Sequence, residues 1–198
     1  MQMVLEFEEK RRIVYFDLET QRSSADVGGW DNKHLMKMAV GIIYDSLDEK
    51  FYTYLEDDIE GLIKKLLSAD LVVGFNILNF DFAVLQPYTP VDLRNEIKCF
   101  DILKDIWNRI GYRVSLNQIA KNTLNIEKSG NGLLSLQWFK EGKMDKIIEY
   151  CIKDVEITRD IFLYGLKNGY LDFEKNGQLV RLPIHWDLNL LLINSGGR

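Results

Sequence analysis

The sequence predicts a single α/β domain with a mixed sheet of about five strands and helices on both faces. The chain has 198 residues, of which 46% are hydrophobic and 28% are charged, and this is enough to bury the core of one globular domain. Strand-like segments come first as a meander and then alternate with segments of helical periodicity. We expect the core at about residues 12–168 and a C-terminal extension over residues 169–198.

Five segments have the composition and periodicity of strands. Residues 12–18 and 71–75 are apolar runs, as in buried strands, whereas residues 35–45 alternate apolar and polar side chains. The polar stretch with paired glycines after the first strand is expected to be a loop. The strands are therefore predicted at residues 12–18, 35–45, 50–56, 71–75 and 97–102.

Apolar residues at helical spacing indicate the helices. The first of them carries acids in its first turn, where the helix dipole favours them. A brief helix after the fourth strand would be capped by Asn79 and closed by Pro87, and the longest helix would end at Gly169. An Asn-Gly turn in the C-terminal extension predicts a hairpin. The helices are predicted at residues 56–70, 79–86, 103–110, 115–124 and 143–169.

Charge and composition exclude several classes of protein. The net charge is −5 and the pI is near 5.2, so a binder that holds nucleic acid by charge alone is disfavoured. An enzyme whose acids hold cations is not, because a bound divalent metal reverses the local sign. The sequence has no apolar stretch long enough for a signal peptide or a membrane span. We therefore expect a soluble, cytoplasmic protein with no membrane association.

The two cysteines, Cys99 and Cys151, fall in a predicted strand and a predicted helix. No closely spaced Cys or His accompanies either of them, as a zinc site would require. Both are expected to be buried apolar residues.

Two acids at alternate positions end the first strand. Because side chains on a strand alternate between faces, Asp17 and Glu19 point the same way, about 6 to 7 Å apart. A polar strand end that meets solvent gives the same pattern. The pair alone therefore does not establish a site.

Two other stretches carry candidate acids. Asp81 falls in the first turn of a helix, where an acid also complements the helix dipole. The loop before it, which starts at Asn76, follows a buried strand, and such loops carry the working residues of α/β sheets. Tyr150 and Asp154 lie one helical turn apart at the margin of the buried face of the longest helix. Each feature on its own also has an ordinary structural explanation.

Together the stretches FDLET, NILNFD and YCIKD resemble, in order, spacing and residue type, the DEDD superfamily of 3′–5′ exonucleases with the ribonuclease-H-like fold. In that superfamily the motifs Asp-x-Glu, Phe/Tyr-Asp and Tyr-x-x-x-Asp converge. The second and third motifs are most similar to those of the proofreading exonuclease domain of family B DNA polymerases. The histidine branch of the superfamily has a His where this chain has Glu149, so the tyrosine branch fits better. The resemblance spans about residues 13–165.

The resemblance implies hydrolysis of phosphodiesters with two metal ions. Carboxylates in one cleft repel one another unless cations compensate them. Two Mg²⁺ or Mn²⁺ ions about 3.5 to 4 Å apart can stabilise both the attacking and the leaving oxygen. By family likeness, Asp17 would bridge both ions and Tyr150 would orient the attacking water. The implied metal ligands are Asp17, Glu19, Asp81 and Asp154.

The resemblance also implies a substrate, the 3′ end of single-stranded DNA or RNA, with nucleoside 5′-monophosphates as products. Residues next to the first motif contact the terminal sugar and base in the family, and these correspond to Leu18 and Thr20. The Asn of the second motif lies near the end of the nucleic-acid strand in the family, and it corresponds to Asn76 here. Stacking aromatics and basic side chains hold single strands elsewhere, and the candidates here are Lys128 and Trp30, although a loop Trp is as often a lid over the core.

Two alternatives stay open. A non-catalytic module of the same fold could grip strand ends or a partner protein, but such a relative would usually lack one or more acids, and none is missing. An endonuclease or strand-transferase of the ribonuclease-H-like class would lack the Tyr-x-x-x-Asp and the Asn-containing second motif. We expect a stand-alone nuclease or the detached nuclease part of a larger machine. Association with a helicase or other replication, repair or RNA-processing machinery is left open.

Overall fold

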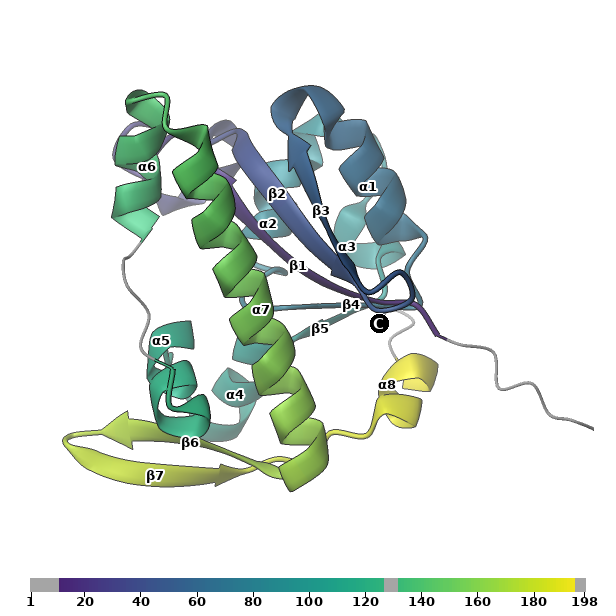
Figure 1. The fold of residues 1–198 in the computed structure, drawn as a ribbon, viewed down its shortest axis with the longest axis vertical. Helices are drawn as coiled ribbons and strands as arrows, with labels where there is room; N and C mark the ends of the chain where they lie inside the picture. The colour runs from purple at the N-terminus through teal and green to yellow at the C-terminus, as the bar shows by residue number, and fades with distance from the viewer. Residues whose placement is uncertain (1–10, 127–131, 195–198) are drawn as a thin grey trace, which may run out of the picture.

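The structure is a computed structural model that describes residues 11–126 and 132–194 (Figure 1). Its main sheet consists of β1 (Ile13–Thr20), β2 (Met38–Asp45), β3 (Lys50–Leu55), β4 (Leu71–Gly74) and β5 (Cys99–Asp101). The strand order is β3-β2-β1-β4-β5. β2 runs antiparallel to β1 and β3, whereas β1, β4 and β5 run parallel. The predicted mixed sheet of five strands is confirmed.

Helices cover both faces of this sheet, as expected. The α-helices are α1 (Ile59–Leu67), α2 (Asp81–Leu85), α3 (Leu93–Glu96), α4 (Ile102–Ile110), α5 (Leu116–Ile119), α6 (Gly132–Lys140), α7 (Met144–Asn168) and α8 (Leu188–Asn194). Shorter helical turns are η1 (Trp30–Leu35), η2 (Glu56–Asp58), η3 (Gln86–Tyr88) and the π-helical η4 (Ala120–Leu124). Apolar side chains of α4, α5 and α7 pack on one face, and those of α1, α2 and α3 pack on the other.

The side chains of β1 alternate between these two faces. Tyr15 belongs to the core under α7, whereas Phe16 belongs to the core under α1 and α2. Asp17 and Glu19 are two and four residues after Tyr15 on the same strand, so their carboxylates point to the same side as Tyr15, which is the side of α7. The register agrees, because Asp17 lies opposite Ile42 of β2, which is buried in the core under α7.

β4 stops before β1 does, at the same edge of the sheet. Just after β4, Asn76 has a φ of 71°, a left-handed conformation that Asn tolerates better than most residues. The backbone N–H of Asn76 donates a hydrogen bond of 2.8 Å to the side chain of Asp101 at the end of β5. The chain turns away there. Asp17 and Glu19 therefore lie on the part of β1 that extends beyond its pairing with β4.

α7 is the longest helix, with 25 residues, and it ends where Gly169 adopts a φ of 75°, as predicted. Tyr150 and Asp154 lie on its buried face, which is nearer the core than the margin expected from the sequence. Asp17 and Glu19 of β1 lie close to Asp154, so the buried face of α7 carries polar side chains where it crosses the end of β1.

The brief helix after β4 differs from the prediction. It begins at Asp81, with Phe80 at the N-cap position and no side-chain cap. Asn79, the predicted cap, instead accepts a hydrogen bond of 3.3 Å from Lys33 Nζ. The predicted capping role of Asn79 is wrong, because the helix begins at Asp81 and the Asn79 side chain binds Lys33 of η1 instead.

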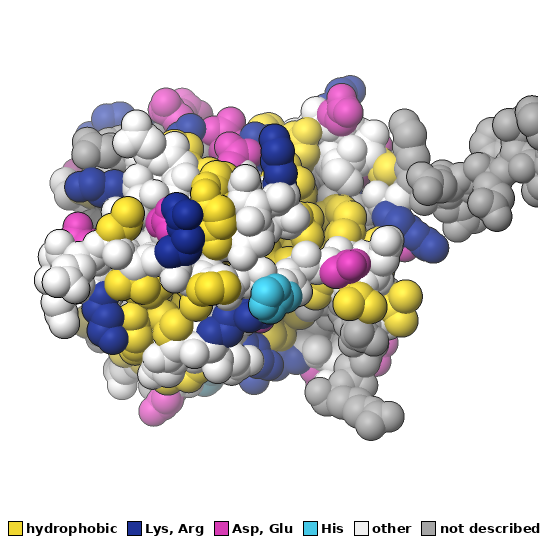
Figure 2. Space-filling model, turned by 90° about the horizontal axis from the view of Figure 1, so that it is seen from below, with side chains coloured by type: hydrophobic (Ala, Val, Ile, Leu, Met, Phe, Trp, Pro, Cys, Tyr) yellow, Lys and Arg dark blue, Asp and Glu magenta, His cyan; other side chains and the backbone are white. Residues whose placement is uncertain are grey.

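The C-terminal extension contains the expected hairpin, in which β6 (Tyr170–Lys175) pairs with β7 (Gln178–Pro183). Asn176 and Gly177 form the turn with φ values of 52° and 76°, as a two-residue hairpin requires. Figure 2 views the molecule from the side of this hairpin and shows hydrophobic side chains at the surface between Lys and Arg side chains. Within residues 11–126 and 132–194, no helix has both the length and the apolar character needed to cross a bilayer.

Candidate active site

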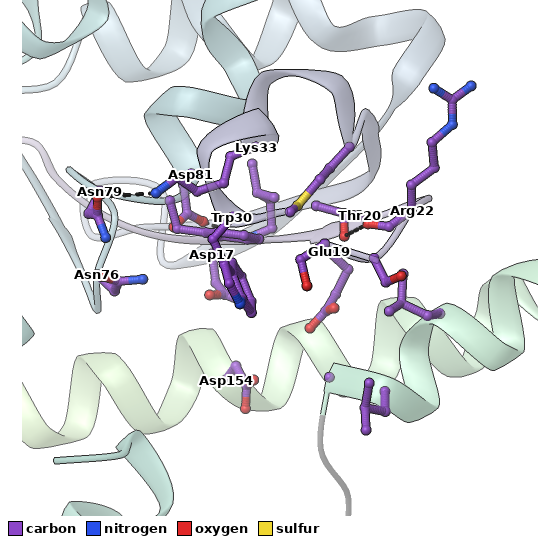
Figure 3. A pocket seen from close by; sticks show the side chains of 18 of the residues that line it. Asp17, Glu19, Thr20, Arg22, Trp30, Lys33, Asn76, Asn79, Asp81 and Asp154 are labelled. Atoms are coloured by element: carbon purple, nitrogen blue, oxygen red, sulfur yellow. Dashed lines mark hydrogen bonds between the residues drawn. The ribbon is translucent and has the colours of Figure 1, made fainter. Parts of the chain in front are cut away.

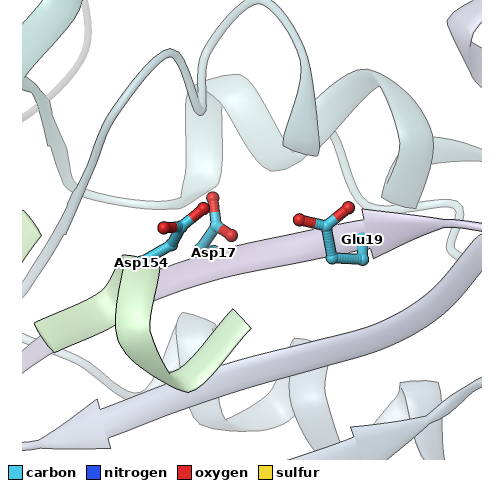
Figure 4. A group of neighbouring side chains, drawn as sticks. All are labelled: Asp17, Glu19 and Asp154. Carbon is cyan, nitrogen blue, oxygen red and sulfur yellow. The ribbon is translucent and has the colours of Figure 1, made fainter. Parts of the chain in front are cut away.

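Three carboxylates from two distant segments meet at the end of β1. Asp17 and Glu19 project from β1 and Asp154 projects from α7 (Figure 4). One oxygen from each lies within 4.8 Å of the others. Oxygen ligands of a single Mg²⁺ are roughly 3 to 4 Å apart at the usual metal–oxygen distance. A small closure of these side chains would therefore suffice to bind a cation.

Asp81 approaches the same place from α2. Its Oδ1 accepts a hydrogen bond of 3.2 Å from the backbone N–H of Leu18, the residue between Asp17 and Glu19. Burial raises the pKa of the Asp81 carboxyl well above its usual range, and the charges of Asp101 and Glu19 raise it further. A cation nearby would favour the ionised carboxylate and reverse this effect.

Tyr150 lies one turn before Asp154 and is largely buried. Its ring meets that of Trp138 on α6 edge to face, at 6.1 Å between centroids. Burial raises the pKa of the Tyr150 hydroxyl, and the charges of Asp154 and Glu19 raise it further. The hydroxyl therefore keeps its proton at neutral pH and can act as a hydrogen-bond donor.

Cys151, next to Tyr150, is fully buried against β1. Its Sγ lies 3.4 Å from both the backbone oxygen and Oδ2 of Asp17. Burial raises the pKa of this thiol well above its usual range, and the charge of Asp17 adds to the effect. Cys151 is therefore a protonated donor to Asp17. Its predicted burial is confirmed, whereas Cys99 is only partly buried.

α6 forms one wall of the site and was not predicted as a helix. Ser135 on α6 is buried, and its hydroxyl donates a hydrogen bond of 2.5 Å to Glu19 Oε2. Together with the contact between Trp138 and Tyr150, this bond connects α6 to both β1 and α7. Ser135 was not among the predicted site residues, because no local pattern around it indicates the contact.

A cleft of about 810 Å³ opens over the acids (Figure 3). Trp30, on η1, is 64% exposed and stands at this cleft, with its ring edge to face with Phe80 at 6.4 Å. Arg22, Lys33 and Arg113 also line the cleft and bring positive charge to it. The predicted site residues that line it are Asp17, Leu18, Glu19, Thr20, Asn76, Asp81, Tyr150 and Asp154.

The remaining substrate candidates have different surroundings. Leu18 and Thr20 line the cleft, but both are largely buried, and the Thr20 hydroxyl donates a hydrogen bond of 3.0 Å to the Arg22 carbonyl. Asn76 lies on the loop after β4, with a larger exposed surface. Lys128 lies outside the described residues.

Comparisons with known proteins agree with this fold. The chain is similar in structure to the family B DNA polymerase from the hyperthermophilic archaeon Pyrobaculum calidifontis, with a TM-score of 0.59 and 16% sequence identity. The similarity covers 79% of this chain and 25% of the polymerase chain, so the present chain spans only about a quarter of the polymerase's length. At this identity the likeness concerns the fold alone. No curated protein sequence matches the chain.

A family model gives a direct assignment. The model described as RNase H superfamily matches residues 14–164. This region runs from β1 to the last turns of α7 and includes every acid of the site. The chain belongs to the RNase H superfamily.

Proposed function

We propose that this protein is a metal-dependent 3′–5′ exonuclease of the tyrosine branch of the DEDD superfamily. It would remove nucleotides from the 3′ end of single-stranded DNA or RNA as nucleoside 5′-monophosphates. The observation that carries the proposal is the meeting of Asp17, Glu19 and Asp154, with ligand atoms within 4.8 Å of one another, in an open cleft. Membership of the RNase H superfamily supports a nuclease.

The donor set fits hard divalent cations. All of its groups are carboxylates, which suit Mg²⁺ and Mn²⁺ and do not favour zinc. Asp17 lies between Glu19 and Asp154 (Figure 4) and would contact both ions, whereas Asp81 stands outside the cluster of three and would act through water. Two such ions would supply an activated water and would stabilise the attacking and leaving oxygens.

Tyr150 would orient the attacking water. Its hydroxyl stays protonated at neutral pH because burial and nearby carboxylates raise its pKa. A protonated phenol positions a water molecule by donating a hydrogen bond and does not remove a proton from it. The contact with Trp138 would fix the ring for this task.

The cations and aromatics of the cleft would hold the strand end. Trp30 offers an exposed ring for a base, and Arg22, Lys33 and Arg113 offset the net charge of −5 where phosphates would lie. Leu18, Thr20 and Asn76 remain the proposed contacts of the terminal nucleotide. Lys128 remains a proposed contact with the strand.

Digestion of matched 5′-labelled DNA and RNA single strands, with Mg²⁺, Mn²⁺ or a chelator, tests the proposal. We expect a ladder that shortens from the 3′ end, requires metal and disappears in the Asp17→Ala variant. Internal cuts would instead indicate an endonuclease. Metal-independent binding without cleavage would indicate a non-catalytic module. Either of these two results would overturn the proposal.

A further inference from the structure

A second, smaller pocket of about 300 Å³ adjoins the cleft. Asn76, Asn79 and Arg113 line both hollows, so they form the rim between them. Lys104 and Trp107 of α4 line the far side of the second pocket. A chain-like molecule that lies in the cleft can therefore continue over this rim and reach α4.

Trp107 presents an aromatic ring that the core does not use. The neighbouring residues Leu103 and Ile106 on α4 are buried, whereas Trp107 is 47% exposed. Exposed indoles beside a pocket are surfaces on which nucleobases stack, with little preference among the bases. This fits a nuclease that accepts many sequences.

The charges around Trp107 suit phosphates. Among the described residues, neither Lys104 nor Arg113 forms an ion pair with a carboxylate. The acid of the pocket, Asp101, is buried and accepts hydrogen bonds of 2.8, 3.1 and 3.2 Å from three backbone N–H groups. Its charge is therefore compensated locally, and the two cations remain available to a polyanion.

The other two cations of the cleft, Arg22 and Lys33, also contact the protein. Arg22 Nη1 donates to the Leu35 carbonyl at 3.3 Å, and Lys33 Nζ donates to Asn79 Oδ1 at 3.3 Å. A strand that leaves toward α4 meets Lys104 and Arg113, whose side chains make no such hydrogen bonds with the described residues.

We propose that Trp107, Lys104 and Arg113 form a subsite for the 5′-ward nucleotides of the single strand whose 3′ end lies at the acids. The inference rests on the proposed function, since it takes the terminal phosphodiester to lie beside Asp17 and Asp154. One base stacks on Trp107, and adjacent phosphates lie near Lys104 and Arg113.

A binding measurement tests the subsite without cleavage. In the Asp17→Ala background, fluorescence anisotropy of a labelled eight-nucleotide single strand should show about tenfold weaker affinity for Trp107→Ala, with Trp107→Phe close to the parent. Lys104→Ala should weaken binding and reduce its salt dependence, whereas Lys64→Ala, an exposed lysine on α1, should not. Equal affinity for Trp107→Ala and the parent, or no binding by the parent, overturns the subsite.

Cleavage distinguishes the failure of the subsite from that of the proposed function. With Mg²⁺ and otherwise wild-type protein, Trp107→Ala should lower kcat/KM for the eight-nucleotide strand several-fold more than for a dinucleotide. An equal loss for both lengths, or a length-dependent loss for Trp30→Ala in place of Trp107→Ala, overturns the subsite. If the wild type cleaves neither strand, the proposed function fails, and the anisotropy result alone decides whether the subsite binds nucleic acid.

Discussion

Ser135 on α6 donates a hydrogen bond of 2.5 Å to Glu19 on β1, across 116 positions of the chain. The same hydroxyl oxygen lies 3.0 Å from the carbonyl of Gly132. A serine has one proton to donate, and a carboxylate attracts it more strongly than a neutral carbonyl does. Ser135 thus fixes the position of the Glu19 carboxylate relative to α6.

Replacing Ser135 by Ala should therefore raise the metal concentration needed for half-maximal cleavage and lower the rate on the order of tenfold, because a hydrogen bond to a charged group is lost. Ser135→Thr keeps a hydroxyl and should retain more activity. Cleavage rates across a Mg²⁺ titration give both quantities. Ser68→Ala, which removes a surface hydroxyl that donates to the Lys65 carbonyl, is the control. An unchanged Mg²⁺ requirement in Ser135→Ala would contradict the positioning role.

Asp17→Ala and Asp154→Ala should each abolish cleavage, with a loss of at least about 100-fold, because a metal ligand is removed. Stability without metal should change little, since the loss of one acid from a repulsive cluster relieves strain. Labelled-strand digestion and thermal unfolding measure the two effects. Asp160→Ala removes an acid of α7 that pairs with Arg159, and it should keep its activity. Retained cleavage in either site variant would overturn the assignment.

Asp81 has two candidate roles that substitutions can separate. If it has only the structural role of joining α2 to β1, the Asp81→Asn variant should cleave normally. The carboxamide oxygen of the Asn can still accept the hydrogen bond from the Leu18 N–H. If it supports a metal ion, Asp81→Asn should lose most cleavage while keeping its stability, and this is the result we expect. Asp81→Ala should lower the free energy of unfolding by about 1 to 3 kcal/mol, since the buried N–H loses its acceptor. Urea denaturation and digestion of the same samples decide between the two roles.

Tyr150→Phe should slow cleavage by the same factor at every pH from about 6 to 9. The pKa of Tyr150 is raised by burial and by Asp154, so the hydroxyl stays protonated below its ordinary value of about 10, and its contribution is constant over this range. Rates of both proteins across the pH range test this, with calorimetry as the control that metal binding is preserved. A ratio of rates that grows with pH would indicate that Tyr150 acts as a base.

The fold and the acids follow from local patterns in the sequence. Alternation and apolar runs locate all five strands of the main sheet to within a few residues, because burial on one or both faces dictates them. That Asp17 and Glu19 point to the same face of the sheet also follows from the local sequence, because they occupy alternate positions of one strand. The approach of Asp154 to these acids is not local, and it was expected only because the three motifs occur together.

The wall of the cleft could not be predicted. In α6 apolar residues are not confined to one face, and Leu133 is 71% exposed, so no amphipathic stripe marks the helix. Ser135 and Trp107 gain their significance from contacts and pockets that depend on the packing of distant elements. The wrong cap predicted at Asn79 has the same origin, because Lys33 of η1, distant in the sequence, binds that side chain.

Anomalous diffraction from crystals soaked in Mn²⁺ tests the proposed metal site most directly. We expect manganese bound by Asp17, Glu19 and Asp154, with a second ion next to Asp17 on the side of Asp81 when a nucleotide is present. If the soaked crystals show these carboxylates without manganese among them, the proposed metal-dependent nuclease is contradicted.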